Sequence, residues 1–314
     1  MAPSLEAVGL TKRFGTFTAL DHLNLKVEGS KCVGFLGPNG AGKTTTLKMF
    51  TDLIFPSEGE AFINGVSVQV DRKRALSSCG DLIETPEIYS SLTPREALEM
   101  SGALRGMSAD EIRDRTAQVI DEVKMTEWAD HKVGRFSKGM KQRINIAAAL
   151  LSDPEVVILD EPSTGLDPRG MAEVRSIVRG LKRDGRLIFM SSHILSEVVD
   201  VCDEVALLDR GKLLFYDSLE NVSHRLGADT RTVEAEFSAA LDDSAVGPIA
   251  TLPGVKSCTR LAPNRLSLGV QGGPAEQSKL LEAIAARHLG LVSFHEARSA
   301  LEEVYLREIS VGDA

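Results

Sequence analysis

The sequence has 314 residues, of which 43% are hydrophobic and 26% charged, and its formal net charge is −9. This composition is ordinary for globular proteins and excludes a largely disordered chain, while the acidic balance argues against a nucleic-acid scaffold, which usually carries a basic excess. The length fits one large domain plus a small one.

Neither a membrane span nor a secretory signal is expected. The longest unbroken apolar run, Ile146–Leu151, has six residues, whereas a membrane-spanning helix needs about 20. Met1–Leu10 lacks the basic start and apolar core of a signal peptide. The four cysteines form no CxxC pair, so we expect reduced thiols in a cytosolic protein.

The first part of the chain alternates short apolar runs with turn residues, a pattern typical of strands. The predicted strands are Leu5–Leu10, Ala19–Val27, KCVGFLG, GEAFING and Cys79–Glu84. A glycine loop, GPNGAGKTT, follows KCVGFLG, and a helix is expected at Lys43–Phe50.

The segment Thr85–Leu151 has helical periodicity instead. TPREALEMSGALRG and SADEIRDRTAQVIDEVKM each favour a helix, and Ser108 with Glu111 matches a capping box. A third helix is expected at Ser137–Leu151. The sequence therefore predicts a helical insert, at about 85–151, within an α/β protein.

From EVVILDEP onwards strands and helices alternate, which is typical of a parallel sheet. The predicted elements are helix Arg169–Arg183, strand Arg186–Met190, helix Leu195–Val201, strand Glu204–Asp209, a hairpin at DRGKLLFYDSL and a helix from Ser218 to Gly227. The first domain is accordingly expected to cover residues 1–227.

Residues 228–314 are expected to form a second, accessory or regulatory domain. After GADT, we predict strands at 231–237, 254–260, 265–271 and 291–296, with helices at 241–250, 275–288 and 299–309. The order βαββαβ plus a terminal helix is typical of a small ferredoxin-like α+β domain.

The segment GPNGAGKT, Gly37 to Thr44, fits the pattern G-x-x-x-x-G-K-[ST]. Glycines in this pattern let backbone N–H groups surround phosphate oxygens. Lys43 can reach the β- and γ-phosphates, and the Thr44 hydroxyl is available to Mg²⁺. Because the segment lies between a predicted strand and a predicted helix, a chance glycine turn is the weaker interpretation.

Two acids follow the apolar strand VVIL, at the carboxyl edge where parallel sheets place their sites. Asp160 suits a Mg²⁺ shell, and Glu161 suits a general base that orients the attacking water. His193, in SSH, follows the next strand and should face the same crevice, within reach of the γ-phosphate. Solvated edge acids and a structural histidine are the alternatives, and the glycine loop on the same sheet disfavours both.

A second anion site is indicated by FSKGMKQRI. Ser137 and Gly139 stand at the start of a predicted helix, where backbone N–H groups are available to bind an anion. A chain with one nucleotide site has no evident need for two such helix starts.

Together, these motifs have the order and approximate spacing found in ATPase subunits of ABC transporters, and the chain resembles that family over about residues 1–220. The resemblance implies a P-loop NTPase cassette with an antiparallel β subdomain, a helical insert, and ATP and Mg²⁺ as ligands. The implied nucleotide-binding residues are Phe14, at the position that usually stacks on adenine, and the P-loop: Gly37, Pro38, Asn39, Gly40, Ala41, Gly42, Lys43, Thr44 and Thr45.

Further roles follow from the same resemblance. The implied catalytic residues are Glu161, Lys43 and the switch histidine His193, and the implied Mg²⁺ ligands are Thr44, Asp160 and Glu84, which stands at the Q-loop position. FSKGMKQR is similar to the family signature LSGGQ, which makes Ser137, Lys138, Gly139 and Met140 the signature segment. The D-loop is Ser163–Asp167, with Ser163, Gly165 and Asp167 as its site residues.

Family members pair head-to-tail, so that the signature segment of one subunit caps the nucleotide held by the P-loop of the other. This explains the second helix start. The implied partners are a second copy of the chain and integral membrane permease subunits, which would hold it on the cytoplasmic face of the membrane as a peripheral protein. No nucleic acid is expected as a partner.

Three positions depart from the usual family pattern. Glu84 replaces a glutamine and adds negative charge beside phosphate, Phe14 replaces the commoner tyrosine, and Met140 replaces a polar residue. LIETPEIYSSLTPREAL and SALEEVYLREI resemble the drug-, bacitracin- and lantibiotic-export branch. By that resemblance, Thr85–Leu98 would include the surface that receives the membrane subunit; an ordinary surface helix is the alternative.

The sequence leaves three other functions open. A soluble ABC-type ATPase acting on nucleic acid or ribosomes is disfavoured, because the chain has no long coiled-coil insert and no second cassette. Import instead of export is disfavoured only by the branch resemblance. A poorly hydrolysing nucleotide switch is disfavoured by Glu161.

Overall fold

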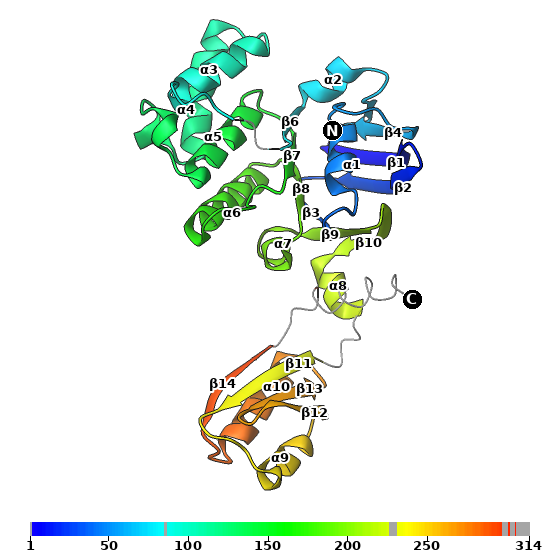
Figure 1. Ribbon diagram of the computed structural model, residues 1–314, viewed down its shortest axis with the longest axis vertical. Helices are drawn as coiled ribbons and strands as arrows, with labels where there is room; N and C mark the ends of the chain where they lie inside the picture. Colours follow the sequence, from blue (N-terminus) through cyan, green and yellow to red (C-terminus); the bar gives the residue numbers. More distant parts are fainter. Residues whose placement is uncertain (1, 85–86, 226–230, 297–300, 302–304, 306–314) are drawn as a thin grey trace. The chain divides into compact units, whose positions relative to one another are not determined.

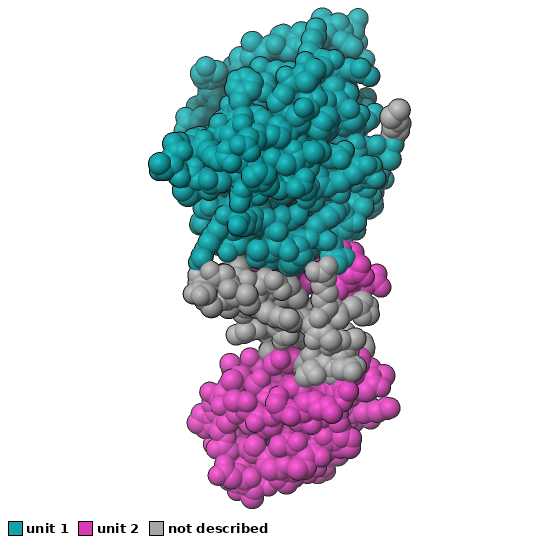
Figure 2. Space-filling view, turned by 90° about the vertical axis from the view of Figure 1, so that its right-hand side faces the viewer, with its two compact units in different colours: residues 1–217 teal, residues 218–314 magenta. Residues whose placement is uncertain are grey.

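The computed structural model describes residues 2–84, 87–225, 231–296, 301 and 305. The chain forms two compact units, residues 1–217 and 218–314, which are coloured separately in Figure 2. Each unit has its own apolar cluster, one containing Phe35, Phe50 and Phe189 and the other containing Phe237. The domain boundary predicted at Gly227 falls outside the described residues.

An antiparallel sheet with strand order β2-β1-β4-β5 opens the first unit (Figure 1). Its strands are β1 (Ser4–Phe14), β2 (Phe17–Glu28), β4 (Glu58–Ile63) and β5 (Val66–Ser67). The first two strands are longer than predicted, because the backbone ladder continues to the pair Phe14–Phe17, where the side chains are exposed and apolar alternation no longer marks it.

The second sheet has the order β10-β9-β3-β8-β7-β6, and the pairs from β9 to β6 are parallel, as predicted. Its strands are β3 (Cys32–Leu36), β6 (Cys79–Leu82), β7 (Val156–Asp160), β8 (Leu187–Ser192), β9 (Glu204–Asp209) and β10 (Lys212–Ser218). Strands β3 and β8 are buried along their whole length, which accounts for their continuous apolar runs.

Three helices follow strands of this sheet: α1 (Lys43–Phe50) after β3, α6 (Pro168–Arg183) after β7 and α7 (Leu195–Val201) after β8. The carboxyl ends of the three strands therefore meet at one edge, where ligand sites of parallel sheets lie. A short helix, α2 (Arg72–Ser77), was not predicted from the sequence.

The predicted helical insert consists of α3 (Pro94–Leu104), α4 (Ala109–Glu122) and α5 (Lys138–Leu150), which lie together in Figure 1. Capping boxes start α3 and α4, from Thr93 and Ser108. Ser137 is the N-cap of α5 and accepts a hydrogen bond from the N–H of Met140. The short 3₁₀ turns at Thr126–Trp128 and Val133–Arg135 were not predicted, because three residues show no periodicity.

The second unit begins with α8 (Leu219–Arg225) and contains an antiparallel sheet of order β12-β13-β11-β14. Its elements in chain order are β11 (Arg231–Phe237), α9 (Asp243–Ala250), β12 (Val255–Ala262), β13 (Arg265–Val270), α10 (Pro274–Ala285) and β14 (Leu291–Glu296). This is the predicted βαββαβ order. The helix predicted at 299–309 lies outside the described residues except at 301 and 305.

None of the helices in the described ranges has both the length and the apolar character that crossing a bilayer requires.

Candidate functional site

Close backbone contacts shape the glycine loop between β3 and α1. A Cβ on Gly37 would lie 2.2 Å from the carbonyl oxygen of Leu208, and a Cβ on Gly42 would lie 2.4 Å from that of Ala19. Gly42 also has φ +104°, which favours glycine. At Gly40, by contrast, a Cβ would meet nothing within 4 Å. The loop is thus fixed against both sheets while one side stays open, leaving room for phosphate oxygens.

Lys43 lies inside this loop, with only 5% of its surface exposed. Its Nζ donates to the carbonyl oxygens of Gly37 and Pro38, at 2.8 and 3.1 Å, and lies 3.8 Å from Oε1 of Glu161. Burial lowers the pKa of Lys43, although the carboxylates of Glu161 and Asp160 act in the opposite direction. An anion in the loop would therefore stabilise the charged ammonium.

A group of oxygen atoms lies beside the loop. The Thr44 hydroxyl at the start of α1 donates to Oδ2 of Asp160 at 2.9 Å, and the Ser191 hydroxyl donates to Oδ1 at 2.5 Å. Among the residues that the structure describes, no group of three or more His, Cys, Asp or Glu could hold a metal ion. Thr44 and Asp160 nevertheless fit Mg²⁺, which commonly takes one or two protein oxygens together with substrate phosphates.

Glu161 follows directly, with a left-handed backbone (φ +44°). Its Oε2 accepts a hydrogen bond from the Thr164 hydroxyl at 2.8 Å and lies 3.0 Å from Nδ1 of His193, while Oε1 faces Lys43. Burial acts to raise the pKa of Glu161, but hydrogen bonds from Thr164 and His193, with the charges of His193 and Lys43, outweigh it and lower the pKa. The carboxylate is therefore ionised at neutral pH and can accept a proton.

The signature segment lies against the D-loop of the same chain. Lys138 Nζ donates to the carbonyl oxygen of Thr164 at 3.1 Å, and a Cβ on Gly139 would lie 3.3 Å from Cα of Gly170 in α6. The side chain of Asp167 caps α6 by accepting from the N–H of Gly170 at 2.9 Å. Ser163 is buried, and its hydroxyl has no hydrogen-bond partner in the described part of the chain.

Not every predicted site residue joins this group. Within the described residues, no hydrogen bond or ion pair connects positions 137–140 to the P-loop. Glu84 is 70% exposed and contacts Lys48 Nζ at 2.6 Å instead of Thr44 or Asp160. Phe14 ends β1 with 51% of its surface exposed and has the ammonium of Lys12 5.0 Å from its ring centre.

Sequence reasoning missed the hydroxyl groups that hold the acids. Ser191 binds Asp160 through its hydroxyl oxygen and accepts from the N–H of Glu161 at 2.9 Å, while Thr164 binds the Glu161 carboxylate. Ser191 lies in the motif SSH and Thr164 in the predicted D-loop, Ser163–Asp167. The hydroxyl residues of these two motifs were the signal that could have identified the contacts.

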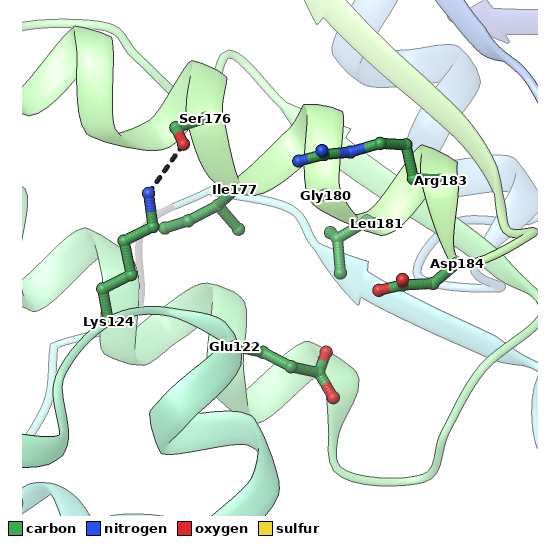
Figure 3. A pocket seen from close by; sticks show the side chains of 8 residues that line it. All are labelled: Glu122, Lys124, Ser176, Ile177, Gly180, Leu181, Arg183 and Asp184. Atoms are coloured by element: carbon green, nitrogen blue, oxygen red, sulfur yellow. Dashed lines mark hydrogen bonds between the residues drawn. The ribbon is translucent and has the colours of Figure 1, made fainter.

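A pocket between the end of α4 and α6 contains none of the predicted site residues (Figure 3). Lys124, just beyond α4, donates to the hydroxyl of Ser176 at 2.7 Å across it. This contact joins the helical insert to α6, away from the acids of the sheet edge.

Comparison with known proteins agrees with the geometry of the glycine loop and the acids beside it. The ABC transporter family matches residues 20–164. The bacitracin transport ATP-binding protein BcrA of Bacillus licheniformis is 41% identical over 68% of this chain and 69% of its own length. The linearmycin resistance ATP-binding protein LnrL of Bacillus subtilis is 30% identical over 96% of this chain and 97% of its own length.

A solved ATP-binding subunit of an ABC transporter has 30% sequence identity and a TM-score of 0.63, covering 71% of this chain and 93% of its own. The predicted ATPase-cassette fold, the family and the ATPase activity are thereby confirmed. The chain belongs to the ABC transporter ATP-binding proteins, a family of ATPases, and within it to the branch that contains the bacitracin transport proteins.

Proposed function

We propose that this chain hydrolyses Mg-ATP as a head-to-tail pair and thereby drives transport, most simply export, through separate membrane subunits. The observation that carries the proposal is the position of the Glu161 carboxylate, held between Lys43 and His193 beside the open glycine loop. The names of the relatives, bacitracin transport and linearmycin resistance, support export of a drug-like cargo.

The residues at the carboxyl edge of the parallel sheet have different roles in hydrolysis. The P-loop N–H groups and Lys43 bind the β- and γ-phosphates, and the Glu161 carboxylate faces Lys43 at 3.8 Å. Glu161 orients the attacking water and takes its proton, while His193 bonds the carboxylate and reaches the γ-phosphate. Thr44 and Asp160 would hold Mg²⁺, which supplies charge neutralisation at the phosphate oxygens when bound.

The signature segment acts on the nucleotide of the partner copy. Its N-cap, Ser137, is exposed, and within the described residues no hydrogen bond or ion pair joins the segment to its own P-loop. A helix start carries about half a positive charge, which favours a phosphate placed against it. ATP between two copies would therefore join them, and hydrolysis would release them.

An apolar groove supports docking of a membrane subunit. It is formed by α3, α5 and Glu87–Tyr89, and its lining includes Tyr89 (68% exposed) and Met100 (41% exposed). It overlaps Thr85–Leu98, the segment expected from the family resemblance to include the surface that receives the membrane subunit. Docking there would place the ATPase on the cytoplasmic face of the membrane as a peripheral subunit.

Co-purification with its membrane subunits tests this function. The chain should show Mg²⁺-dependent ATP hydrolysis and co-purify from its native cells with a multispanning membrane protein. Tyr89→Arg should reduce that co-purification without loss of ATP binding, whereas Val70→Arg, at a residue 81% exposed outside the groove, should not. Recovery of nucleic acid or ribosomes with no membrane protein would favour the soluble alternative.

Glu84→Gln should leave ATP hydrolysis within about tenfold of wild type, equivalent to about 1.4 kcal/mol in the barrier. Lys48 faces the Glu84 carboxylate at 2.6 Å and offsets the negative charge that glutamate adds at this position. Glutamate and glutamine also both offer a side-chain oxygen to Mg²⁺. The rate constant for hydrolysis at saturating Mg-ATP checks this, and a collapse of activity would show that the negative charge itself is required.

A further inference from the structure

Two side chains of α5 hold the segment Pro162–Gly165 of the same chain. Lys138 Nζ donates to the carbonyl oxygen of Thr164 at 3.1 Å, and Gln142 Nε2 donates to that of Pro162 at 2.9 Å. Being four residues apart, Lys138 and Gln142 lie on one face of the helix. Gln142 is only 4% exposed, so burial holds its side chain in place against the carbonyl oxygen of Pro162.

The backbone at Gly165 makes room for the lysine. Gly165 has φ +70°, and a Cβ there would lie 2.4 Å from Lys138 Nζ. Next to it, the starts of α5 and α6 meet at Gly139 and Gly170, where a Cβ on Gly139 would be 3.3 Å from the Cα of Gly170. The start of α5 is therefore packed directly against the D-loop and the helix that follows it.

Thr164 joins this contact to the carboxylate of Glu161. Its carbonyl oxygen accepts from Lys138, its N–H donates to the carbonyl oxygen of Glu161 at 3.1 Å, and its hydroxyl donates to Oε2 of Glu161 at 2.8 Å. With Oε2 held in this way, Oε1 faces Lys43 at 3.8 Å. A glutamate side chain has three rotatable bonds. A fixed hydrogen-bond donor selects one arrangement of them, which reduces the side-chain entropy that must be lost to orient the carboxylate for catalysis.

We propose that Thr164 is a positioning residue for ATP hydrolysis, and that Lys138 and Gln142 let the start of α5 set the orientation of Glu161 within its own chain. The inference rests on the proposed role of Glu161 as the base. The signature segment would thus act on the partner's nucleotide and, through Thr164, also on Glu161 of its own chain. A displacement of the start of α5 reaches the Glu161 carboxylate through only two side-chain hydrogen bonds.

The first test separates the hydroxyl of Thr164 from its backbone groups. Thr164→Val should lower kcat by about tenfold and leave KM for ATP within about twofold, because it alters the position of the base and not the P-loop. Thr164→Ser keeps the hydroxyl and should retain most of kcat. Lys138→Met should lower kcat in the same direction, whereas Lys141→Met, which removes a charge from the same helix, should not.

The split between kcat and KM, with rescue by Thr164→Ser, is a readout that a purely structural role would not move. A general loss of folded protein would lower the activity of both Thr164 variants, whereas a positioning role affects kcat only where the hydroxyl is removed.

Combining Thr164→Val with Glu161→Gln tests whether Thr164 acts through Glu161. If Thr164 acts through Glu161, then Thr164→Val should cause no further loss in the Glu161→Gln background. An additive loss, or a wild-type kcat in Thr164→Val, would overturn the inference and leave the proposed function intact. Near-normal turnover of Glu161→Gln alone would instead overturn the proposed function. Should Thr164→Val fail to fold, Lys138→Met alone and combined with Glu161→Gln gives the same comparison.

Discussion

Glu161→Gln should bind Mg-ATP normally and hydrolyse it about 10²–10⁴-fold more slowly than wild type, because an amide cannot take the proton of the attacking water. The P-loop contacts of Lys43 to Gly37 and Pro38 do not involve this carboxylate, so affinity should persist. ATP should then accumulate in a stable pair of chains. Single-turnover hydrolysis, ATP titration and size-exclusion chromatography together measure these three properties.

Two further variants serve as controls for this prediction. Lys43→Ala should lose nucleotide affinity, since it removes the buried ammonium inside the loop; unchanged binding would refute the P-loop assignment. Glu60→Gln, at an exposed position of β4, removes a carboxylate outside the site and should match wild type. Glu161 has no part in the chemical step if its glutamine variant turns over at a near-normal rate.

Ser137→Arg should abolish ATP-driven dimerisation and hydrolysis while leaving ATP binding to the same chain nearly intact. The arginine places bulk and charge at the start of α5, where close approach of backbone N–H groups to the partner's phosphate is needed. The ATP-binding loop of the same chain is built from Gly37–Thr45, to which Ser137 forms no hydrogen bond in the described residues. Analytical ultracentrifugation with and without ATP, beside an ATP titration, measures both effects.

Loss of the helix cap needs its own control. Ser137 accepts from the N–H of Met140, and replacing such a cap by alanine costs about 0.5–2 kcal/mol of stability. Ser137→Gly costs only a few tenths of a kcal/mol and should preserve most dimerisation. If the glycine variant fails as completely as the arginine variant, then the hydroxyl, and not the space at the helix start, is what dimerisation requires.

Much of the fold was predictable because its signals are local. The strands β3 and β7 are continuous apolar runs, α1 follows the glycine loop, and the boundaries of β9 and β14 agree with the predicted ones. The elements that were missed, such as α2 and the two 3₁₀ turns, are too short to show a period. The polar ends of β1 and β2 were missed because a backbone ladder can continue where side chains no longer alternate.

The acids and the P-loop could be assigned to one edge because parallel strands place their carboxyl ends together. The side-chain contacts could not be assigned in this way. Lys138 to Thr164, Lys48 to Glu84 and Ser191 to Asp160 connect residues 26 to 36 positions apart, and nothing in their local sequence specifies the distances. The motifs alone therefore do not specify which partner holds each predicted side chain in place.

The central claim, that the signature segment acts on the partner's nucleotide, is tested most directly by mixing two inactive proteins, Ser137→Arg and Lys43→Ala. In a head-to-tail pair, one composite site combines the intact Lys43 of one chain with the intact Ser137 of the other, and the second site carries both changes. If one sound site suffices, the mixture should regain ATPase activity that neither protein has alone. Loss of ATP affinity in Ser137→Arg by itself would contradict the account, because it would place Ser137 in the nucleotide pocket of its own chain.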